Sequence, residues 1–261
     1  MPQKKLKISI ITVSYNNEKT IADTIRSVKS QTYSCVEHII IDGASTDNTM
    51  VIVNQFKEHL GRVLSEPDEG IYYAMNKGIE MATGDVIGFI NADDILASDN
   101  VLANVAKTLE DENLDSCYAN LVYVKSKNLD KVVRFWKASP HTSGSFSQGW
   151  SPPHPTFYVK KKIYQQFGYF NLNYKMGNDI ELMMRFLERY HITTTYVAEV
   201  WVKMRFGGVS NNSIKNIFTQ NYEIYRSARK NHVPFFVPQF IVGKIKDRIG
   251  QYLWHKSKDK A

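Results

Sequence analysis

The chain has 261 residues, of which 43% are hydrophobic and 23% are charged, and this composition is typical of a globular protein. Its two cysteines, Cys35 and Cys117, form neither a Cys-x-x-Cys pair nor a Cys/His cluster, which argues against a zinc ribbon and a disulfide framework. We find no secretion signal and no apolar run of about 18 residues, so we expect a cytoplasmic protein without a membrane span.

The net charge of +7 is concentrated near the C-terminus. Between Lys244 and Ala261, six Lys and Arg side chains oppose two Asp side chains, and this segment holds more than half of the surplus. The rest of the chain is nearly balanced in charge, so we expect no broad nucleic-acid-binding surface. A basic segment of this kind suits an anionic membrane surface or a phosphorylated substrate.

Strand and helix patterns alternate along the first part of the chain. The β-branched run at 7–13 predicts a strand buried on both faces, and Gly61 is expected to end the second helix as its C-cap. The patterns predict strands at 7–13, 36–41, 62–65 and 86–90, and helices at 21–28, 53–60, 71–82 and 101–109. This alternation is typical of a doubly wound α/β fold, in which helices cover both faces of a mostly parallel sheet.

Acidic residues follow two of the predicted strands. Asp42 and Asp47 come after the second strand, and Asp93 and Asp94 come after the fourth. Ligands of open α/β sheets bind at the carboxyl ends of the strands. Turn formation or helix capping explains any one of these acidic loops equally well, but carboxylates that converge on one edge repel each other unless a cation or ligand offsets them.

Glycine-rich phosphate loops do not occur at this edge. The turn after the first strand is Ser-Tyr-Asn-Asn, where a dinucleotide-binding fold would need Gly-x-Gly-x-x-Gly, and the chain has no Gly-x-x-x-x-Gly-Lys-Ser/Thr sequence. An acidic edge is still able to bind a diphosphate through a divalent cation that carboxylate oxygens hold.

An ordered set of motifs resembles the family-2 glycosyltransferases, which have the GT-A fold. The motifs are SIITVSYNN, IIIDGASTDNT, EPDEGIYYAMNKGIEMATGD, VIGFINADD, HPTFYVKKKIYQQFGYFN, NDIELMMRF and FGGVS, and they lie between residues 6 and 210. The resemblance implies a catalytic domain at 1–210 and a helical, basic, amphipathic extension at 211–261. The subgroup that the chain most resembles serves bacterial surface-polysaccharide synthesis and moves one sugar from a nucleotide-sugar donor, here expected to be a UDP-sugar.

The resemblance implies a donor site at the carboxyl edge of the sheet. Asp42 would accept the N–H of a uracil or thymine base, with a turn residue as the alternative. Asn91 stands where the family's Asp-x-Asp signature begins with Asp, and Arg205 is a candidate for the diphosphate because a guanidinium offers a planar fork of donors. The implied donor-binding residues are Ser14, Tyr15, Asn16, Asp42, Asp68, Asn91, Ala92, Asp93 and Arg205.

The resemblance also implies that the reaction depends on a metal ion. Asp93 would bind Mg²⁺ or Mn²⁺, and the cation would neutralise charge on the leaving nucleotide. Asp94 is either a second ligand or a residue that orients the first one. A capping turn before the next helix is the alternative interpretation.

Asp179, near the start of a predicted helix, matches the general base of the family. It would take the proton of the acceptor hydroxyl during in-line attack, which inverts the anomeric configuration. An N-cap is the alternative for Asp179. His154 and Glu181 are implied on the acceptor or diphosphate side, with a surface turn as the alternative for His154 and a structural role as the interpretation that we favour for Glu181.

The C-terminal segment has two interpretations. After an amphipathic helix at 214–230, the apolar residues Ile245, Ile249, Leu253 and Trp254 alternate with cations. A basic helix with an apolar face fits in-plane binding to an anionic membrane, here the inner face of the cell membrane, and the family's acceptors are often saccharides linked to undecaprenyl diphosphate. The alternative is a helix docked on its own protein or on a second subunit.

Two other functions compete with single-sugar transfer. A sugar-1-phosphate nucleotidyltransferase shares the α/β nucleotide fold, but it would need a glycine-rich, arginine-bearing loop after the first strand. A catalytically silent, membrane-associated protein would use the fold as a scaffold. We favour transfer of one sugar, because the chain has neither the Gln-x-x-Arg-Trp sequence nor the membrane spans of polymerising family members.

Overall fold

The computed structural model describes residues 5–207 and 214–258, and the side chains of 214, 215 and 252–258 lie outside that description. Gly208, Val209 and Ser210 of the last motif, and the side chains of Leu253 and Trp254, are therefore not described. The strands are β1 (Ile8–Ser14), β2 (Val36–Asp42), β3 (Arg62–Ser65), β4 (Val86–Phe89), β5 (Ile95–Leu96), β6 (Ser116–Lys125), β7 (Asn128–Trp136), β8 (Tyr158–Lys160) and β9 (Thr194–Arg205).

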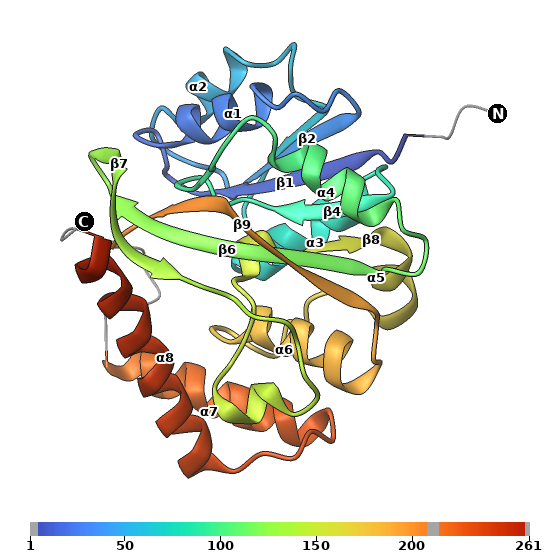
Figure 1. The fold of residues 1–261 in the computed structure, drawn as a ribbon. Coiled ribbons are helices and arrows are strands. Elements are labelled where there is room, and N and C mark those ends of the chain that lie inside the picture. Colours follow the sequence, from blue (N-terminus) through green and yellow to red (C-terminus); the bar gives the residue numbers. More distant parts are fainter. Residues whose placement is uncertain (1–4, 208–213, 259–261) are drawn as a thin grey trace.

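The helices lie between and after these strands (Figure 1). They are α1 (Ile21–Lys29), α2 (Thr49–Asn54), α3 (Ile71–Met81), α4 (Val101–Leu109), α5 (Lys161–Phe167), α6 (Asn178–Met184), α7 (Ile214–Lys230) and α8 (Val237–Lys258), with the short helical turns η1 (Ser145–Gln148), η2 (His154–Thr156) and η3 (Arg185–Arg189).

One curled sheet contains all of these strands, in the order β3-β2-β1-β4-β8-β6-β9-β5, with β7 paired to β6. The first four strands pair in parallel, β1 with β2 and β4, and β2 with β3. The sheet changes direction at β8, which is antiparallel to both β4 and β6. The predicted α/β fold is confirmed, and the antiparallel strands are an addition that the sequence pattern did not predict.

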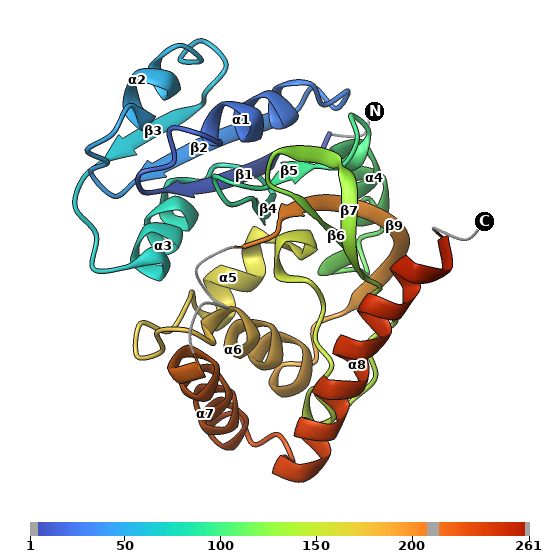
Figure 2. The ribbon, with the colours of Figure 1, turned by 90° about the vertical axis from the view of Figure 1, so that its left-hand side faces the viewer.

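Side chains of β1, β2 and β4 are buried on both faces of the sheet, since successive side chains of a strand point to opposite sides. Ile11 and Val13 of β1 belong to the cluster that contains α3, whereas Ile8 and Ile10 belong to the cluster that contains α4. Figure 2 shows α1 and α2 on one side of these strands and α3 on the other. The continuous apolar runs of β1, β2 and β4 follow from this double covering.

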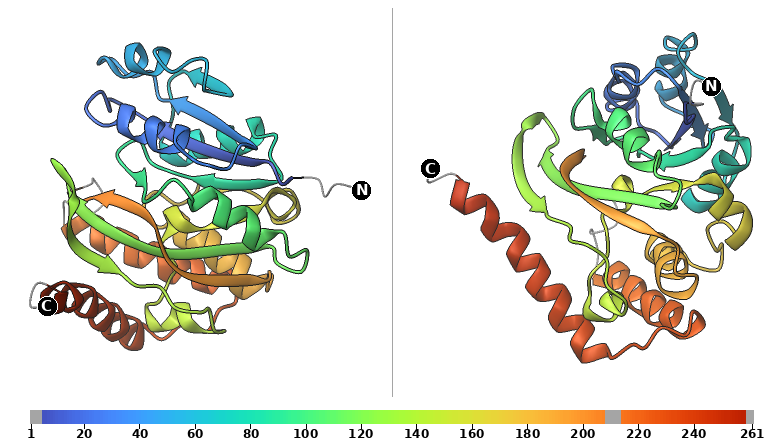
Figure 3. Two further views of the ribbon diagram at one scale, coloured as in Figure 1. Left: turned by 45° about the horizontal axis from the view of Figure 1, so that its top comes forward. Right: turned by 45° about the vertical axis from the view of Figure 1, so that its right-hand side comes forward.

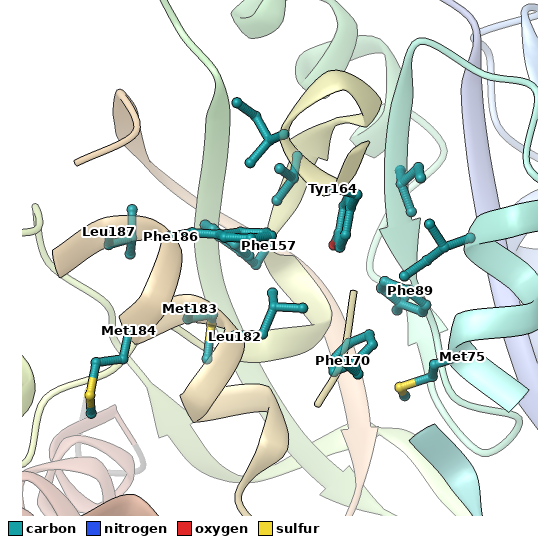
Figure 4. Packing of buried hydrophobic residues seen from close by; sticks show 14 of the residues in the cluster. Met75, Phe89, Phe157, Tyr164, Phe170, Leu182, Met183, Met184, Phe186 and Leu187 are labelled. Atoms are coloured by element: carbon teal, nitrogen blue, oxygen red, sulfur yellow. The ribbon is translucent and has the colours of Figure 1, made fainter. Parts of the chain in front are cut away.

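The cluster beneath the sheet joins the two ends of the chain. Met75 of α3 and Phe89 of β4 lie close to Phe170 and Leu182, which belong to the segment that leads into α6 and to α6 itself (Figure 4). The same cluster includes Ile224 and Ala228 of α7 and Phe240 of α8. The C-terminal helices therefore share a hydrophobic core with the strands of the parallel sheet.

Helix α8 crosses the molecule beside β7 and η1 (Figure 3). Two glycines permit this close approach: an added Cβ would lie 1.6 Å from the Gln148 carbonyl oxygen at Gly243 and 2.5 Å from the Lys244 backbone nitrogen at Gly149. Gln251, farther along α8, is buried and accepts a hydrogen bond from Arg134 of β7. One face of α8 is thus docked on its own chain.

The predicted helix at 53–60 is wrong in its bounds. Helix α2 ends at Asn54, and Gly61 lacks the positive φ of a left-handed C-cap. An added Cβ at Gly61 would lie 2.9 Å from Glu37 Cγ, so close packing against β2 explains the glycine. The predicted helices at 71–82, 101–109 and 214–230 agree with α3, α4 and α7 within one residue.

Among residues 5–207 and 214–258, no helix has both the length and the apolar character that a membrane-spanning helix needs.

Candidate active site

The turns after β1 and β2 lie side by side, because Ser14 and Asp42 are register partners at the ends of parallel strands. Asn16 has a left-handed backbone with φ of 53°, which Asn tolerates better than most residues. Its backbone N–H donates to Ser45 Oγ at 2.8 Å, and its side-chain oxygen accepts the Thr46 backbone N–H at 2.9 Å. These hydrogen bonds join the two turns into one edge.

Asp42, the predicted base-recognition residue, is fully buried at this edge. Its carboxylate accepts hydrogen bonds from the Ser45 backbone N–H at 2.9 Å, from Ser45 Oγ, and from Ser65 Oγ at 2.7 Å. A nucleotide base would therefore bond Asp42 only through a lone pair that these two serines leave free.

Asp68 offers an unused acceptor close by. Lys77 lies 2.5 Å from its Oδ1 and 2.7 Å from Glu66 Oε1, and the Asp68 side chain is only 7% exposed. Its Oδ2 is buried and has no hydrogen-bond partner among the described residues. An added Cβ at Gly43 would lie 3.6 Å from this oxygen and 3.5 Å from the ring of Tyr15, which is itself exposed.

The turn after β4 holds the two predicted metal ligands. Ala92 is buried against α1 and α2, and Asn91 Nδ2 donates to Asp94 Oδ2 at 3.0 Å. Asp94 is fully buried, and its Oδ1 finds no hydrogen-bond partner within the described part of the chain. Burial and the neighbouring carboxylate of Asp93 raise the pKa of Asp94 well above its ordinary value.

Arg205, at the end of β9, lies against the predicted metal ligands. Its Nε donates to the backbone oxygen of Asp93 at 3.0 Å, and its Nη2 forms an ion pair with Asp23 at 2.6 Å. Burial raises the pKa of Asp93, and the charge of Arg205 opposes that rise. Beside them lies a cavity of about 390 Å³, lined by Asn16, Asn17, Glu18, Lys19, Thr20, Asp47, Asp93, Ser126, Arg205, Phe206 and Gly207.

The acidic turn fits a divalent cation in its chemistry. Two adjacent carboxylates disfavour each other's charge, and a buried carboxylate oxygen lacks a partner among the residues described here. Within the same residues, no three His, Cys, Asp or Glu side chains are grouped so that they could hold a metal ion. Asp93 and Asp94 would thus supply at most two ligands, and substrate oxygens and water would complete the shell.

Asp179 and His154 come together from distant segments. Asp179 lies in the first turn of α6, and its Oδ2 is 3.3 Å from His154 Nδ1 in η2. Burial lowers the pKa of His154, and the Asp179 carboxylate opposes that shift. The Oδ1 atom of Asp179 is buried and accepts no hydrogen bond from the side chains and backbone that the structure describes.

Two residues that the sequence analysis did not assign to the site hold the start of α6 in place. Glu223 of α7 accepts the backbone N–H groups of Lys175, Met176 and Gly177 at 2.8–3.0 Å. Tyr72 of α3 is partly buried, and this burial together with the charge of Asp179 raises its pKa well above the ordinary value. The only signal of Glu223 in the sequence is its place on a polar helix face, which solvent exposure explains equally well.

Glu181 does not face the same space as Asp179. It is buried and forms an ion pair with Arg185 at 3.1 Å, and it accepts a hydrogen bond from Asn231 at 3.3 Å. This geometry supports the structural role that we favoured and removes the reason to place Glu181 on the acceptor or diphosphate side.

Lys244 is more buried than its place in a basic tail predicts. Its ammonium group donates to Asn221 Oδ1 of α7 at 2.9 Å. Burial and the nearby Arg248 lower the pKa of Lys244 to about 8, and the Asp179 carboxylate acts in the opposite direction. Helix α7 thus contacts both α8, through Asn221 and Lys244, and the segment before Asp179, through Gln220 and Met176.

Sequence comparisons find related proteins that are named as glycosyltransferases. The profile described as Glycosyl transferase family 2 matches residues 9–168. A Mycobacterium bovis protein described as a PGL/p-HBAD biosynthesis glycosyltransferase is 30% identical over 215 residues, which cover 80% of this chain and 81% of that protein. A Mycobacterium tuberculosis protein described as an uncharacterized glycosyltransferase is 28% identical over 180 residues, 68% of each chain.

Solved structures with the same fold include S. aureus TarS 1–349, with a TM-score of 0.68 at 17% identity over 92% of this chain and 72% of that one. A second is the mannosyltransferase PcManGT from Pyrobaculum calidifontis in complex with GDP-Man and Mn²⁺, with a TM-score of 0.65 at 18% identity over 92% and 68%. At these identities the likeness concerns the fold alone, and it agrees with the predicted α/β architecture.

Proposed function

Because the chain belongs to glycosyltransferase family 2, we propose that it moves one sugar from a UDP-sugar to a hydroxyl group of a lipid-linked saccharide, with inversion at the anomeric carbon. Use of a nucleotide sugar is supported by the fold neighbours, since TarS was solved with UDP-GlcNAc and PcManGT with GDP-Man. Family membership also favours sugar transfer over nucleotidyl transfer and over a silent scaffold.

The observation that carries the proposal concerns Oδ1 of Asp179. This atom is buried and accepts no hydrogen bond from any described residue. An acceptor hydroxyl is a donor that would satisfy this oxygen, and a carboxylate placed so is suited to take the hydroxyl proton. His154 would hold the other oxygen through its Nδ1–H, since burial keeps the imidazole neutral at pH 7.

The proposed reaction is a single in-line displacement. The acceptor oxygen forms a bond to the anomeric carbon as its proton passes to Asp179, and the bond between that carbon and the β-phosphate oxygen breaks. The electron pair of that bond leaves with the nucleoside diphosphate. Attack from the face opposite the leaving group inverts the anomeric configuration.

The donor is expected at the edge formed by β1, β2 and β4. Asp42 and Asp68 would both lie near the base, and the free Oδ2 of Asp68 is the better placed acceptor for an imide N–H, since the serines already occupy Asp42. Tyr15 would lie against the base or ribose. Ser14, Asn16, Asn91 and Ala92 would shape this edge through their backbone.

A divalent cation, Mg²⁺ or Mn²⁺, would bind at Asp93 and Asp94 and would supply charge neutralisation for the diphosphate. Arg205 would assist there once the diphosphate competes with its present partners, Asp23 and the Asp93 backbone oxygen. The Mn²⁺ in the PcManGT complex supports the choice of ion.

We place the acceptor side of the enzyme at an anionic membrane surface. The exposed face of α8 carries Ile241, Ile245 and Ile249, which are 48%, 54% and 53% exposed. Lys246 and Arg248 lie beside this apolar stripe, as in helices that bind in the plane of a membrane. Docking of one face and membrane contact of the other are compatible, so the two interpretations of this helix need not compete.

The proposal is tested by incubating the protein with a panel of nucleotide sugars and measuring the released nucleotide. UDP release should require Mn²⁺ or Mg²⁺, should stop in excess EDTA, and should resume when the metal is restored. Asp93→Ala should abolish turnover while the melting temperature stays near that of the wild type.

Asp130→Ala is the matched control, because Asp130 is 94% exposed and lies outside the site. It should turn over like the wild type. Full activity in excess EDTA would refute metal dependence, and a panel that yields no nucleotide and no glycosylated product would refute sugar transfer.

A further inference from the structure

Lys244 is held in a fixed place by three parts of the chain. Its backbone nitrogen lies against Gly149 of the turn after η1, its ammonium group donates to Asn221 of α7 at 2.9 Å, and it lies 5.1 Å from the ring centre of Phe240 on its own helix. A solvated tail lysine would have none of these contacts. Figure 2 shows α6, α7 and α8 around the lower part of the molecule, and Lys244 belongs to α8.

This lysine and Arg248, one helical turn later, form no ion pair with the described residues, although the Asp247 carboxylate lies close enough to Arg248 for their charges to interact. No carboxylate among residues 5–207 and 216–251 lies within 4.0 Å of either cation. The two cations lie close enough for Arg248 to lower the pKa of Lys244, in addition to the effect of burial. A half-buried ammonium group beside a second cation is unfavourable unless an anion joins them.

We infer that Lys244 and Arg248 bind a phosphate group that joins the acceptor saccharide to its lipid. The inference rests on the proposed function, in which Asp179 takes the proton of the acceptor hydroxyl. Lys244 donates to Asn221, and the neighbouring Gln220 donates to the Met176 backbone oxygen at 3.4 Å, three residues before Asp179. An anion bound by Lys244 would therefore belong to the molecule whose hydroxyl reaches Asp179.

The order of groups along this face matches the order of groups in such an acceptor. Asp179 would meet the hydroxyl, Lys244 and Arg248 the phosphate, and the exposed stripe of Ile241, Ile245 and Ile249 the lipid chain. The donor diphosphate is assigned elsewhere, to the turn after β4 and the end of β9. Two separate cationic positions therefore serve two different phosphates.

Farnesyl diphosphate is a suitable probe, with farnesol as the uncharged comparison, and calorimetric titration measures both affinities. The wild type should bind the diphosphate at least about 10-fold more tightly than the alcohol, since hydrogen bonds to charged groups contribute on that scale. Lys244→Met should lose most of this preference, whereas Lys244→Arg should keep much of it. Lys107→Gln, which removes a charge from the exposed side of α4, should bind the probe within about twofold of the wild type.

The inference is overturned if Lys244→Met weakens probe binding no more than Lys107→Gln does. It is also overturned if Lys244→Met weakens binding to phosphatidylglycerol vesicles but not to farnesyl diphosphate, because Lys244 would then bind the headgroups of membrane lipids. If Lys244→Met does not fold, Arg248→Gln carries the same test from an exposed position. Probe binding requires no sugar transfer, so the two proposals fail separately. If the protein shows no turnover but binds the probe through Lys244, the proposed function is refuted and the phosphate site is supported.

Discussion

The proposed donor edge, at the turns after β1, β2 and β4, and the proposed acceptor side, around Asp179 and His154, are held together in different ways. At the donor edge, polar groups bond within one turn or to the turn beside it, as Asn91 does to Asp94 and Asn16 does to Thr46. On the acceptor side, Asp179, His154, Asn221 and Lys244 come from four separate elements, η2, α6, α7 and α8. The first site is defined by hydrogen bonds within and between the turns at the edge of the sheet, and the second is defined by helix packing.

This difference decides which changes should damage which site. A local turn keeps its geometry when a distant helix loosens, because its hydrogen bonds do not depend on that helix. The acceptor side depends on Glu223 to hold the start of α6 and on Phe240 to hold α8. Loss of packing at the C-terminal helices should therefore affect the acceptor side first.

The largest expected effect is at the proposed base. Asp179→Asn keeps the size of the side chain and much of its hydrogen bonding, but the amide cannot take a proton. Transfer to the acceptor should fall by roughly 10²-fold to 10⁴-fold, the usual contribution of a general base. UDP binding, measured by titration, should stay near the wild-type value, because the donor edge is built independently.

The matched control for this variant is Glu181→Gln, which changes a buried carboxylate two residues away. Its expected defect is in stability, because it breaks the ion pair with Arg185, and a folded fraction should transfer sugar at a rate of the wild-type order. Transfer within a few-fold of wild type by Asp179→Asn would exclude Asp179 as the base.

The contrast between the two sites also explains what the sequence could predict. Strands β1, β2 and β4 and helix α7 are recognisable because apolar runs and helical spacing are local patterns that burial enforces. Strands β5 and β8, with two and three residues, owe their pairing to neighbours in the sheet and carry no pattern of their own.

The site residues follow the same division. The acidic turns at Asp42 and Asp93 stand out in the sequence, because each follows a buried strand. Lys244 does not stand out in the sequence, since a lysine in a basic helix is equally suited to solvent. Its partial burial follows from the docking of Gly243 on η1, which the sequence does not show. Neither could the sequence show that Ser45 and Ser65 occupy the carboxylate of Asp42.

A change in the packing of α8 should affect the stability of the C-terminal helices and not that of β1 and β2. Phe240 of α8 is buried and lies 4.8 Å from the ring centre of Phe235. Phe240→Ala should weaken the docking of α8 by about 3 kcal/mol, the lower end of the cost of such a deletion in a core. Hydrogen exchange should then rise in α8 and in the turn with η1, while β1 and β2 stay protected.

Ile245→Ala is the control for this variant, because Ile245 lies on the exposed face of the same helix and its loss should leave exchange in α8 nearly unchanged. Equal acceleration of exchange in β1 and α8 after Phe240→Ala would show that the two halves unfold together. The contrast between a local donor edge and a docked acceptor side would then be wrong.

The smallest expected effect compares two histidines, one in each half: His38 is buried, and the side chain of His154 is 30% exposed. Burial and the nearby His59 lower the pKa of His38 in β2 to about 3, whereas the lowering at His154 is opposed by Asp179. The unfolded chain has a His pKa near 6.5, so below that pH it binds a proton that folded His38 refuses. His38 therefore leaves stability intact above about pH 6.5 and removes up to about 1.4 kcal/mol per pH unit as the pH falls toward 3.

Urea unfolding of the wild type and of His38→Gln between pH 7 and pH 5 measures this slope. The difference between the two proteins is the decisive quantity, because the raised pKa of Asp94 stabilises the fold as the pH falls and would partly hide the effect of His38 in the wild type alone. Gln retains a partner for Thr12 Oγ1, which lies 3.0 Å from His38 Nε2, so the variant should fold. His154→Gln should change the slope less, since Asp179 stabilises the imidazolium that low pH produces. Equal slopes in the two variants would mean that the Asp179 carboxylate does not offset the effect of burial on the pKa of His154. The contact between His154 and Asp179 would then contribute no electrostatic stabilisation.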